Sequence, residues 1–523
     1  MSAFRRWLAA TALLVSAVVA GPTSASPRSL TRTVADAITE MDVERARRWL
    51  ERIDANSPAV VFERARLAVY LGECELAATM LNVPQFLDSK EAVQLAALAQ
   101  SCARATVAGF VVEDKERGIW LRMQDDSDRA LAPFIFDVAA RARDAVGRDL
   151  GVDLPKPLRI DLVRDLFSLS AVSGLPLTAA ETTGTLAVAR WGRVIILTPR
   201  ATGLGYPWQD TLAHEITHLM LTRASRDQAP LWLQEGIAKR EETRWRAERA
   251  FDDPNWADVV ARTALVSGRS VGIDKLGPSL AMLPTAEAAS TAYAEVTSFM
   301  DFFLREAGEP GFRMLLADLR GYGAEGGADA ALRSVTGYSL SEWKLRWEAE
   351  LRKAPAAAVG QPPAVAKAGP EPDGGSTGDD PRELMRRVRL GDLLSRRAHA
   401  KAASIEYDLA LPRAKEEPAV RWRAARASLA AGDRAASERN LGVMADINHP
   451  HYGWLALNGR FQRELGREAD AEAGLLHALG LNPYSEDAAC EGHFTLGGGQ
   501  PDTLPNDPIW RALCEEASKA AQD

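Results

Sequence analysis

Near the start of the chain, apolar residues recur every three or four positions, the spacing of a helix that buries one face. Val34, Ile38 and Met41 would share one such face, and Gly72 stands where a later helix would end, because glycine readily adopts the left-handed conformation of a helix C-terminus. Later helices are predicted over 60–70, 74–81 and 90–102. Paired helices with short breaks predict a small helical-repeat domain over residues 29–105.

Beyond Thr106 the pattern changes to short alternating runs that are typical of strands. Strands are predicted over 107–112, 119–123, 158–163 and 194–197, and helices over 130–150, 207–222 and 232–246. Helices then dominate to about residue 353. A few strands followed by helices indicate an α+β domain over residues 106–353, within a chain that is mostly helical.

Residues 354–381 interrupt this pattern. The stretch is dense in Ala, Pro and Gly and nearly free of large apolar residues, so it has too little apolar surface to fold and is predicted to be a disordered linker. Helical pairs return over residues 382–523. Two segments there, 429–436 and 464–471, each place a glycine between two helices with small alanines after it. They resemble tetratricopeptide (TPR) repeats, which implies protein binding or scaffolding.

Residues 1–25 have the layout of a secretory signal peptide. Arg5 and Arg6 precede an apolar, uncharged run from Leu8 to Ala20, and small residues that suit a cleavage site occur up to Ala25. The run is short for a membrane span, which needs about 20 residues. We expect an exported bacterial protein, periplasmic or secreted; the alternative is an uncleaved N-terminal anchor, and only then would the chain be held at a membrane.

Charge and cysteine content narrow the functional classes. The net charge of −8 argues against nucleic-acid binding, since such proteins are usually basic. The four cysteines, Cys74, Cys102, Cys490 and Cys514, are an even number, which fits two disulfides in an exported protein. Three pairings are open, and the pairing of near neighbours would staple a helical segment at each end. Four buried free thiols are the alternative.

The strongest chemical signal is the HExxH sequence from His214 to His218. Residues four apart on a helix point the same way, so these two imidazoles can bind one metal ion. Glu215 lies next to His214 and can reach a water molecule on that ion. Leu212, Ile216, Leu219 and Met220 recur at helical spacing and would bury the motif helix in the core.

A catalytic zinc usually takes three protein ligands and keeps a position for water. His214 and His218 are the only histidines before residue 399, so the third ligand of the same domain is expected to be acidic. Glu235 follows His218 after sixteen residues, enough for a loop that returns a second helix, and Gly236 would let that helix approach closely. Glu241 and Glu242, on the same predicted helix, are rival ligands.

The segment around Glu235 reads Leu-Trp-Leu-Gln-Glu-Gly-Ile-Ala, and HExxH followed by WLxEGxA resembles the gluzincin metallopeptidases, in particular the peptidase MA-like domain. The resemblance covers about residues 106–353. It implies one Zn²⁺ held by His214, His218 and Glu235, with Glu215 as general base and Tyr293 as the candidate donor to the oxyanion. A packed core tyrosine is the alternative for Tyr293.

One position differs from the residue pattern of the gluzincins. Lys239 stands where some gluzincins have an acid that steadies a metal-bound histidine, so that role is open, and Asp210 is a candidate for it. Aminopeptidases of the gluzincin group bind the substrate N-terminus through a glutamate on a strand that precedes the HExxH motif. The corresponding segment here, residues 184–190, has no glutamate, so the resemblance favours an endopeptidase.

These observations predict an exported zinc metallopeptidase that acts on a peptide or protein substrate, with helical repeats that bind a protein partner. Two alternatives remain. The chain could be a non-catalytic TPR-type scaffold that keeps a gluzincin-like fold, or a metal-binding protein without turnover. Glu215 favours the enzyme, because a site that only binds metal has no need of it.

Overall fold

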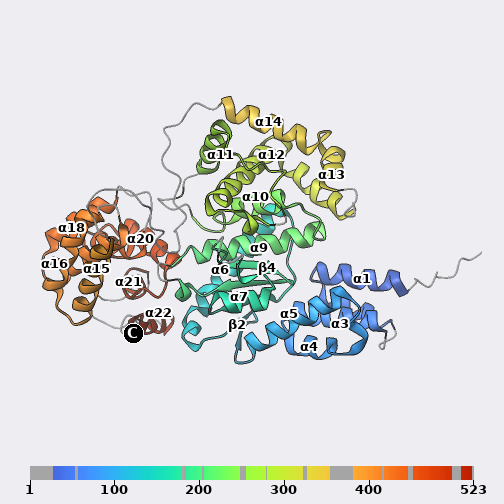
Figure 1. The fold of residues 1–523 in the computed structure, drawn as a ribbon, viewed down its shortest axis with the longest axis horizontal. Helices are drawn as coiled ribbons and strands as arrows, with labels where there is room; N and C mark the ends of the chain where they lie inside the picture. Colours follow the sequence, from blue (N-terminus) through green and yellow to red (C-terminus); the bar gives the residue numbers. More distant parts are fainter. Residues whose placement is uncertain are drawn as a thin grey trace, which may run out of the picture.

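The computed structural model describes residues 27–520 except 54–56, 179–180, 182–183, 203–204, 248–251, 253–254, 278, 322–326, 354–380, 415–416, 446–450 and 497–507. The predicted signal peptide therefore lies outside the described residues, and so does the predicted linker apart from Pro381, which begins a helix. The described chain is mostly helical with one five-stranded sheet, which confirms the predicted α+β, mostly helical class (Figure 1).

The first group of helices is drawn in blue in Figure 1. It comprises α1 (Pro27–Thr39), α2 (Val43–Leu50), α3 (Pro58–Leu71), α4 (Cys74–Leu81) and α5 (Lys90–Thr106). Gly72 ends α3 in the left-handed conformation, φ 81°, as its sequence position predicts. The helices bury two apolar clusters of their own, one built on α1 to α3 and one on α3 to α5.

The sheet follows in the order β1-β2-β3-β5-β4. Its strands are β1 (Phe110–Asp114), β2 (Ile119–Met123), β3 (Leu158–Val163), β4 (Ala187–Arg190) and β5 (Arg193–Leu197). β2, β3 and β5 are parallel, and β1 and β4 run antiparallel at the two edges. The first strand begins at Phe110, three residues later than predicted, because α5 extends to Thr106.

Helices cover both faces of the sheet. On one face, α6 (Ala132–Leu150) and α9 (Trp208–Ser225) join the main core. On the other, α7 (Leu166–Ser173) packs with the disulfide between Cys74 and Cys102. Since side chains alternate between faces along a strand, α7 and this disulfide lie on the opposite side of the sheet from the motif helix.

A buried ionic cluster attaches the N-terminal helices to their face of the sheet. Asp161 on β3 accepts from Arg122 Nε at 2.6 Å and from Arg193 NH1 at 2.8 Å. Arg122 NH1 also donates to the carbonyl of Gly72 at 2.7 Å. Arg193 is fully buried. The C-terminal end of α3 therefore docks on the sheet through a carbonyl that the helix itself cannot satisfy.

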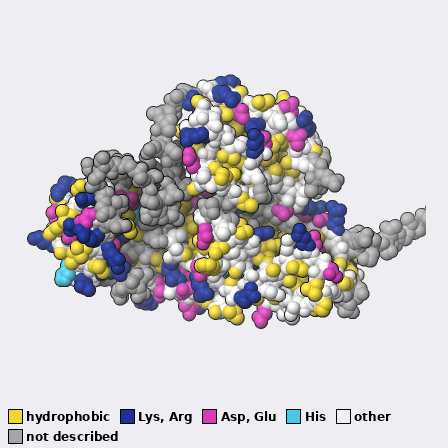
Figure 2. All heavy atoms as spheres, viewed as in Figure 1, with side chains coloured by type: hydrophobic (Ala, Val, Ile, Leu, Met, Phe, Trp, Pro, Cys, Tyr) yellow, Lys and Arg dark blue, Asp and Glu magenta, His cyan; other side chains and the backbone are white. Residues whose placement is uncertain are grey.

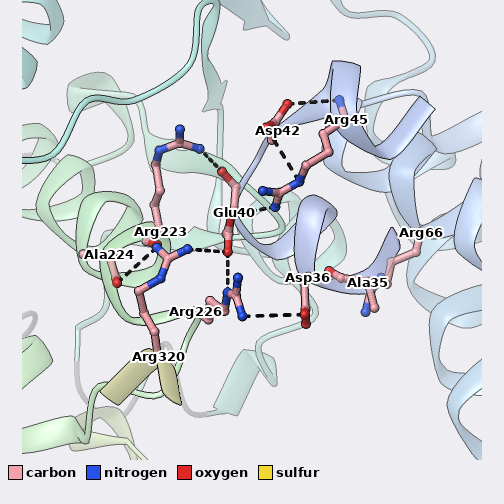
Figure 3. Close-up of polar contacts among 10 residues, drawn as sticks. All are labelled: Ala35, Asp36, Glu40, Asp42, Arg45, Arg66, Arg223, Ala224, Arg226 and Arg320. Atoms are coloured by element: carbon pink, nitrogen blue, oxygen red, sulfur yellow. Dashed lines mark hydrogen bonds and ion pairs between the residues drawn. The ribbon is translucent and has the colours of Figure 1, made fainter. Parts of the chain in front are cut away.

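Glu40, which follows α1, forms a second attachment (Figure 3). Its carboxylate binds Arg45 at 2.6 Å and Arg320 at 2.7 Å, and it also binds Arg226. The Glu40 carbonyl accepts from Arg223. Arg223 and Arg226 stand at the end of the motif helix, so one buried carboxylate ties the N-terminal segment to that helix.

The remaining helices of the central part lie above the sheet in Figure 1. They are α10 (Leu231–Glu241), α11 (Trp256–Ser267), α12 (Ala286–Gly321), α13 (Gly327–Thr336) and α14 (Leu340–Lys353). α12 contains a kink at Gly308, where φ is 71° and ψ is 167°. The predicted helix over 232–246 is five residues too long, because α10 ends at Glu241.

The C-terminal group, orange to red in Figure 1, consists of helical pairs. They are α15 (Pro381–Arg396), α16 (Ala400–Ala410), α17 (Pro418–Ala430), α18 (Arg434–Ala445), α19 (Tyr452–Glu464), α20 (Glu468–Leu481), α21 (Glu486–Leu496) and α22 (Pro508–Ala520). A second disulfide joins Cys490 on α21 to Cys514 on α22. Both disulfides thus follow the near-neighbour pairing.

The C-terminal helices pack against the start of α9. The last turn of α20 offers the carbonyl of Leu481 to Tyr206 N–H at 2.9 Å and that of Leu479 to Trp208 Nε1 at 3.1 Å. Tyr484 donates to the buried Asp128 at 2.8 Å. Buried residues of the C-terminal helices belong to the same apolar cluster as those of the central part.

Among the described residues, no helix combines the length and apolar character needed to cross a bilayer. On the face drawn in Figure 2, basic, acidic and hydrophobic side chains are interspersed over the coloured surface, and no continuous basic stripe crosses it.

Candidate metal centre

The motif helix α9 is buried along most of its length. Leu212, Ile216, Leu219 and Met220 all lie in the main core, as their helical spacing predicts. The opposite side of the helix carries His214 and the half-buried His218. The apolar face therefore fixes the rotation of the helix and turns the polar pair toward α10 and α12.

The second helix approaches α9 after a tight reversal. Arg226 and Asp227 directly follow α9, and both have positive φ, 54° and 60°. This left-handed backbone ends the helix and reverses the direction of the chain. Gly236 on α10 then lies against α12, where an added Cβ would come within 2.5 Å of both Met300 Cγ and Val296 O. Only glycine permits this approach, as the sequence predicts, and the contact places α10 beside the histidines.

His214 and His218 present their Nε2 atoms to a common point. These atoms are 3.2 Å apart, and Glu235 Oε2 lies 3.5 Å from the first and 3.6 Å from the second. Within the described residues, these three form the group that could hold a metal ion. Glu235 Oε2 is buried without a hydrogen-bond donor, although a buried carboxylate oxygen requires a partner.

The spacing of the donor atoms suits a small divalent ion. The centre of the triangle lies about 2.0 Å from each atom, close to the distances of about 2.0–2.2 Å that zinc takes to imidazole nitrogen and carboxylate oxygen. Two histidines and one glutamate leave a fourth position open, which is the pattern of a catalytic rather than a structural site. The residues present therefore fit zinc.

Each histidine has a partner for its other ring nitrogen. His218 Nδ1 lies 3.1 Å from Gln234 Oε1, and His214 Nδ1 lies 3.4 Å from Glu242 Oε2. Both acceptors favour the tautomer with hydrogen on Nδ1, which leaves Nε2 free to bind a metal. Glu242 is itself held by Lys239 Nζ at 2.5 Å.

Sequence reasoning missed both partners. The sequence predicts no role for Gln234, although it adjoins Glu235 on the same helical turn. Glu242 is predicted only as a rival metal ligand, yet a residue seven positions beyond Glu235 shares its face of the predicted helix over 232–246. That spacing was the available signal. Lys239, three residues before Glu242, binds that acid.

Two other candidates lie elsewhere. Asp210 accepts from Trp245 Nε1 at 3.1 Å and pairs with Arg246 at 2.7 Å, so its predicted role as a histidine partner is wrong. Glu241 is fully buried between Arg240 and Arg244. Its side chain points away from the histidines because it lies six residues from Glu235, on a different face of the helix.

The electrostatics of the site favour positive charge. Burial alone would lower the pKa of His214, but Glu235 and Glu242 outweigh it and raise that pKa to about 10. Burial alone would raise the pKa of Glu235, but His218 and His214 hold it well below its usual range. The carboxylates thus create a negative potential where the Nε2 atoms meet, and this potential favours a cation.

Glu215 lies beside the group without belonging to it. Its carboxyl is buried, which raises its pKa, while the charges of His218 and His214 oppose the rise. The backbone N–H of Ala189 on β4 also hydrogen-bonds this carboxylate. A carboxyl with a raised pKa beside a group that could hold a metal is placed to act as a proton acceptor.

The edge strand β4 turns part of its backbone away from β5, on the side of Glu215. Leu197 N–H donates to the carbonyl of Leu186 at 2.9 Å, so the hydrogen-bonding pairs with β5 alternate from that residue. Ala187 and Ala189 consequently direct their N–H and C=O groups away from β5, toward the open edge of the sheet. An extended peptide could add to this edge as a further strand.

Tyr293 lies at the border of the site on α12. Its ring is edge-on to the His214 ring, with 6.3 Å between the centroids. Burial and the negative charges of Glu235 and Glu215 raise its pKa well above the usual value. The hydroxyl therefore keeps its proton at neutral pH and can donate a hydrogen bond. The structure thus brings together all five residues named from the sequence: His214, Glu215, His218, Glu235 and Tyr293.

Comparisons with known proteins do not place the chain in a family. A scan of the sequence finds no matching family model, and a search of curated proteins finds no significant match. The functional argument therefore depends on the residues of the site and their geometry.

Proposed function

We propose that this protein is an exported, zinc-dependent endopeptidase of the gluzincin type. The observation that carries the proposal is the triangle formed by His214 Nε2, His218 Nε2 and Glu235 Oε2. Glu215 lies next to this triangle but is not one of its three members. Two disulfides support export, because disulfides persist mainly in oxidising compartments.

In this proposal His214, His218 and Glu235 hold the ion, while Gln234 and Glu242 keep the two imidazoles in orientation. When bound, zinc polarises the scissile carbonyl and makes water a usable nucleophile near neutral pH.

Glu215 accepts a proton from the attacking water and returns it to the leaving nitrogen. Tyr293 donates a hydrogen bond to the oxygen on which negative charge develops, a contribution typically of about 3 kcal/mol.

The substrate would bind as an extended chain along the open edge of β4. Ala187 would exchange backbone hydrogen bonds with it and Ala189 would offer its carbonyl, since the Ala189 N–H is bound to Glu215. This aligns the scissile bond without demanding a particular side chain. No glutamate lies on residues 184–190 to bind a free amino terminus, and this favours cleavage within a chain. The C-terminal helical pairs, fixed against the start of α9, would supply a further surface for a protein substrate or partner.

The test begins with metal content, measured by elemental analysis of the purified protein after zinc is supplied. We expect about one zinc per chain, lost or much weakened in Glu235→Ala and kept in Glu215→Gln. Hydrolysis of a quenched-fluorescence peptide library should disappear in both variants. No zinc in the unmodified protein would overturn the proposal and leave the TPR-type scaffold as the better account. Bound zinc with no hydrolysis of any peptide would favour a metal-binding protein without turnover.

A matched control is available on the same helix. Burial raises the pKa of Glu241 to about 7, so this carboxyl is partly neutral already, and glutamine resembles its neutral form. Glu241→Gln should keep both zinc and activity. Loss of zinc in this control would show that any change in α10 disturbs the site, and the assignment of Glu235 would then lose its support.

A further inference from the structure

A cavity of about 250 Å³ lies between the N-terminal helices and the central part of the chain. One side is formed by α1, α2 and α3, and the other by the chain before β3, the turn before β5, and α9. Leu219, the residue after His218, lines it. The cavity therefore lies behind the motif helix, on the side away from the histidines.

Most of the wall is apolar. The apolar side chains that define it are Ile38, Met41, Leu67, Leu154, Leu158 and Leu219. An apolar cavity of about 150 Å³ is large enough to hold benzene, so this one has room for a ligand with a short aliphatic chain.

Arg159 supplies a positive charge at this wall. No described carboxylate lies within ion-pair distance of it, and its Nε is buried without an acceptor. Its NH1 reaches only the carbonyl of Pro157, at 3.3 Å. Arg159 is half-buried, so its guanidinium has lost part of its hydration without gaining a paired anion, and an incoming anion would offset that loss.

The acidic residues at the cavity do not neutralise Arg159. Asp42 accepts from Arg45 N–H at 3.0 Å at the start of α2 and lies 3.8 Å from Arg45 Nε. Glu44 pairs with Arg47 at 3.3 Å, and both of these side chains are more than half exposed. Each acid therefore has its own arginine.

The surroundings add further positive charge. On the same face of the sheet, Arg122 and Arg193 share the single carboxylate of Asp161. Three of their guanidinium nitrogens, Arg122 NH2, Arg193 Nε and Arg193 NH2, are buried without acceptors. Together with Arg159, three arginines lie on neighbouring strands of this face. Asp161 pairs with two of them, while Glu73 and Glu113 attract Arg159 only at longer range and Arg47 repels it.

We propose that this cavity binds an aliphatic carboxylate, with the carboxylate on Arg159 and the alkyl group against the apolar wall. The same chemistry occurs in a free short-chain acid and in the C-terminal residue of a peptide, and either could supply the ligand. This site is separate from the metal centre, and it stands whether or not the chain is a peptidase.

Isothermal titration calorimetry with isovalerate and with N-acetyl-leucine tests the proposal, and N-acetyl-leucinamide serves as the uncharged match. We expect saturable binding of at least one acid and a concentration-dependent rise in the unfolding temperature, because a ligand of the folded state stabilises it. Isovalerate binding alone would identify the free acid as the ligand, and N-acetyl-leucine binding alone would identify the peptide terminus. The amide should bind at least about tenfold more weakly, since it cannot form the charge-assisted bond.

Two variants connect the binding to Arg159. Arg159→Gln should weaken binding about tenfold or more, and Arg159→Lys, which keeps the charge, should retain part of it. Arg47→Gln alters an arginine at the same cavity that has its own carboxylate, and it should bind like the unmodified protein. Equal affinity for acid and amide, an equal effect of both glutamine variants, or no binding at millimolar concentration would each overturn the proposal.

Discussion

The attachment of Glu40 to the end of the motif helix leads to a quantitative prediction for Glu40→Gln. The variant keeps the size of the side chain and removes its charge. It weakens three charge-assisted contacts, with Arg45, Arg226 and Arg320. Fully buried contacts of this kind are worth about 1.5–3 kcal/mol each. The Glu40 side chain is only 6% exposed, but the three arginines are 31–37% exposed and partly screened by water.

We therefore assign about 1 kcal/mol to each contact and expect a loss of about 2–3 kcal/mol in the free energy of local opening. Such a loss should speed amide hydrogen exchange in α1 by about 30-fold or more at pH 7. Exchange measured by mass spectrometry on peptides from α1, α2 and the end of α9 provides the assay. Glu44→Gln is the control, because Glu44 is 71% exposed and its pair with Arg47 should contribute little.

The pH dependence supplies a second check. Burial alone would raise the pKa of Glu40, but hydrogen bonds from Arg226 and Arg45 and the charge of Arg320 outweigh it and lower the pKa. A lowered pKa in the folded state means that the stabilisation is present above the unfolded value and is lost as pH falls through the folded value. The difference between variant and unmodified protein should therefore shrink below about pH 4. Equal exchange rates in α1 for Glu40→Gln and Glu44→Gln at pH 7 would refute the reasoning.

Three further changes test the site and its packing. Glu242→Gln should weaken zinc binding by about 10- to 100-fold in a chelator competition, because it removes the charged partner of His214 Nδ1. An unchanged affinity would remove Glu242 from the site. Tyr293→Phe should keep zinc and lower kcat by about 100-fold or more in peptide hydrolysis; an unchanged kcat would assign Tyr293 to packing alone. Gly236→Ala should lower the thermal midpoint, at a cost of about 1–3 kcal/mol, because its Cβ would come within 2.5 Å of Met300 Cγ. A midpoint equal to that of the unmodified protein would show that α12 can move away.

The local sequence pattern was sufficient to predict many of the helices and strands and the main residues of the site. Helical periodicity located the motif helix, and the four-residue spacing of His214 and His218 placed their imidazoles on one side of it. The requirement for a close helix approach was readable from Gly236, since a glycine inside a helix usually has a packing reason. These features depend on residues that are near one another in the sequence, where backbone geometry alone sets the relation between side chains.

Tertiary structure decided what depends on distant segments. The spacing of Glu242 from Glu235 fits a shared helical face, but its contact with His214 Nδ1 depends on how α10 packs against α9. Asp210 was a plausible candidate by sequence distance, yet Arg246 binds it more than thirty residues later. Which charges pair is decided by the approach of separate helices, and hydrophobic periodicity carries no information about that approach.

The sequence by itself determined that this chain is mostly helical with a few strands, and that two histidines and a glutamate occur at metal-binding spacing. Only the tertiary structure decided that Glu235 Oε2 faces both Nε2 atoms, that the edge of β4 lies beside Glu215, and that Glu40 joins the N-terminal helices to the end of α9. The physical reason is that periodicity selects which face of an element is buried, whereas the position of one element against another depends on the packing of the whole core.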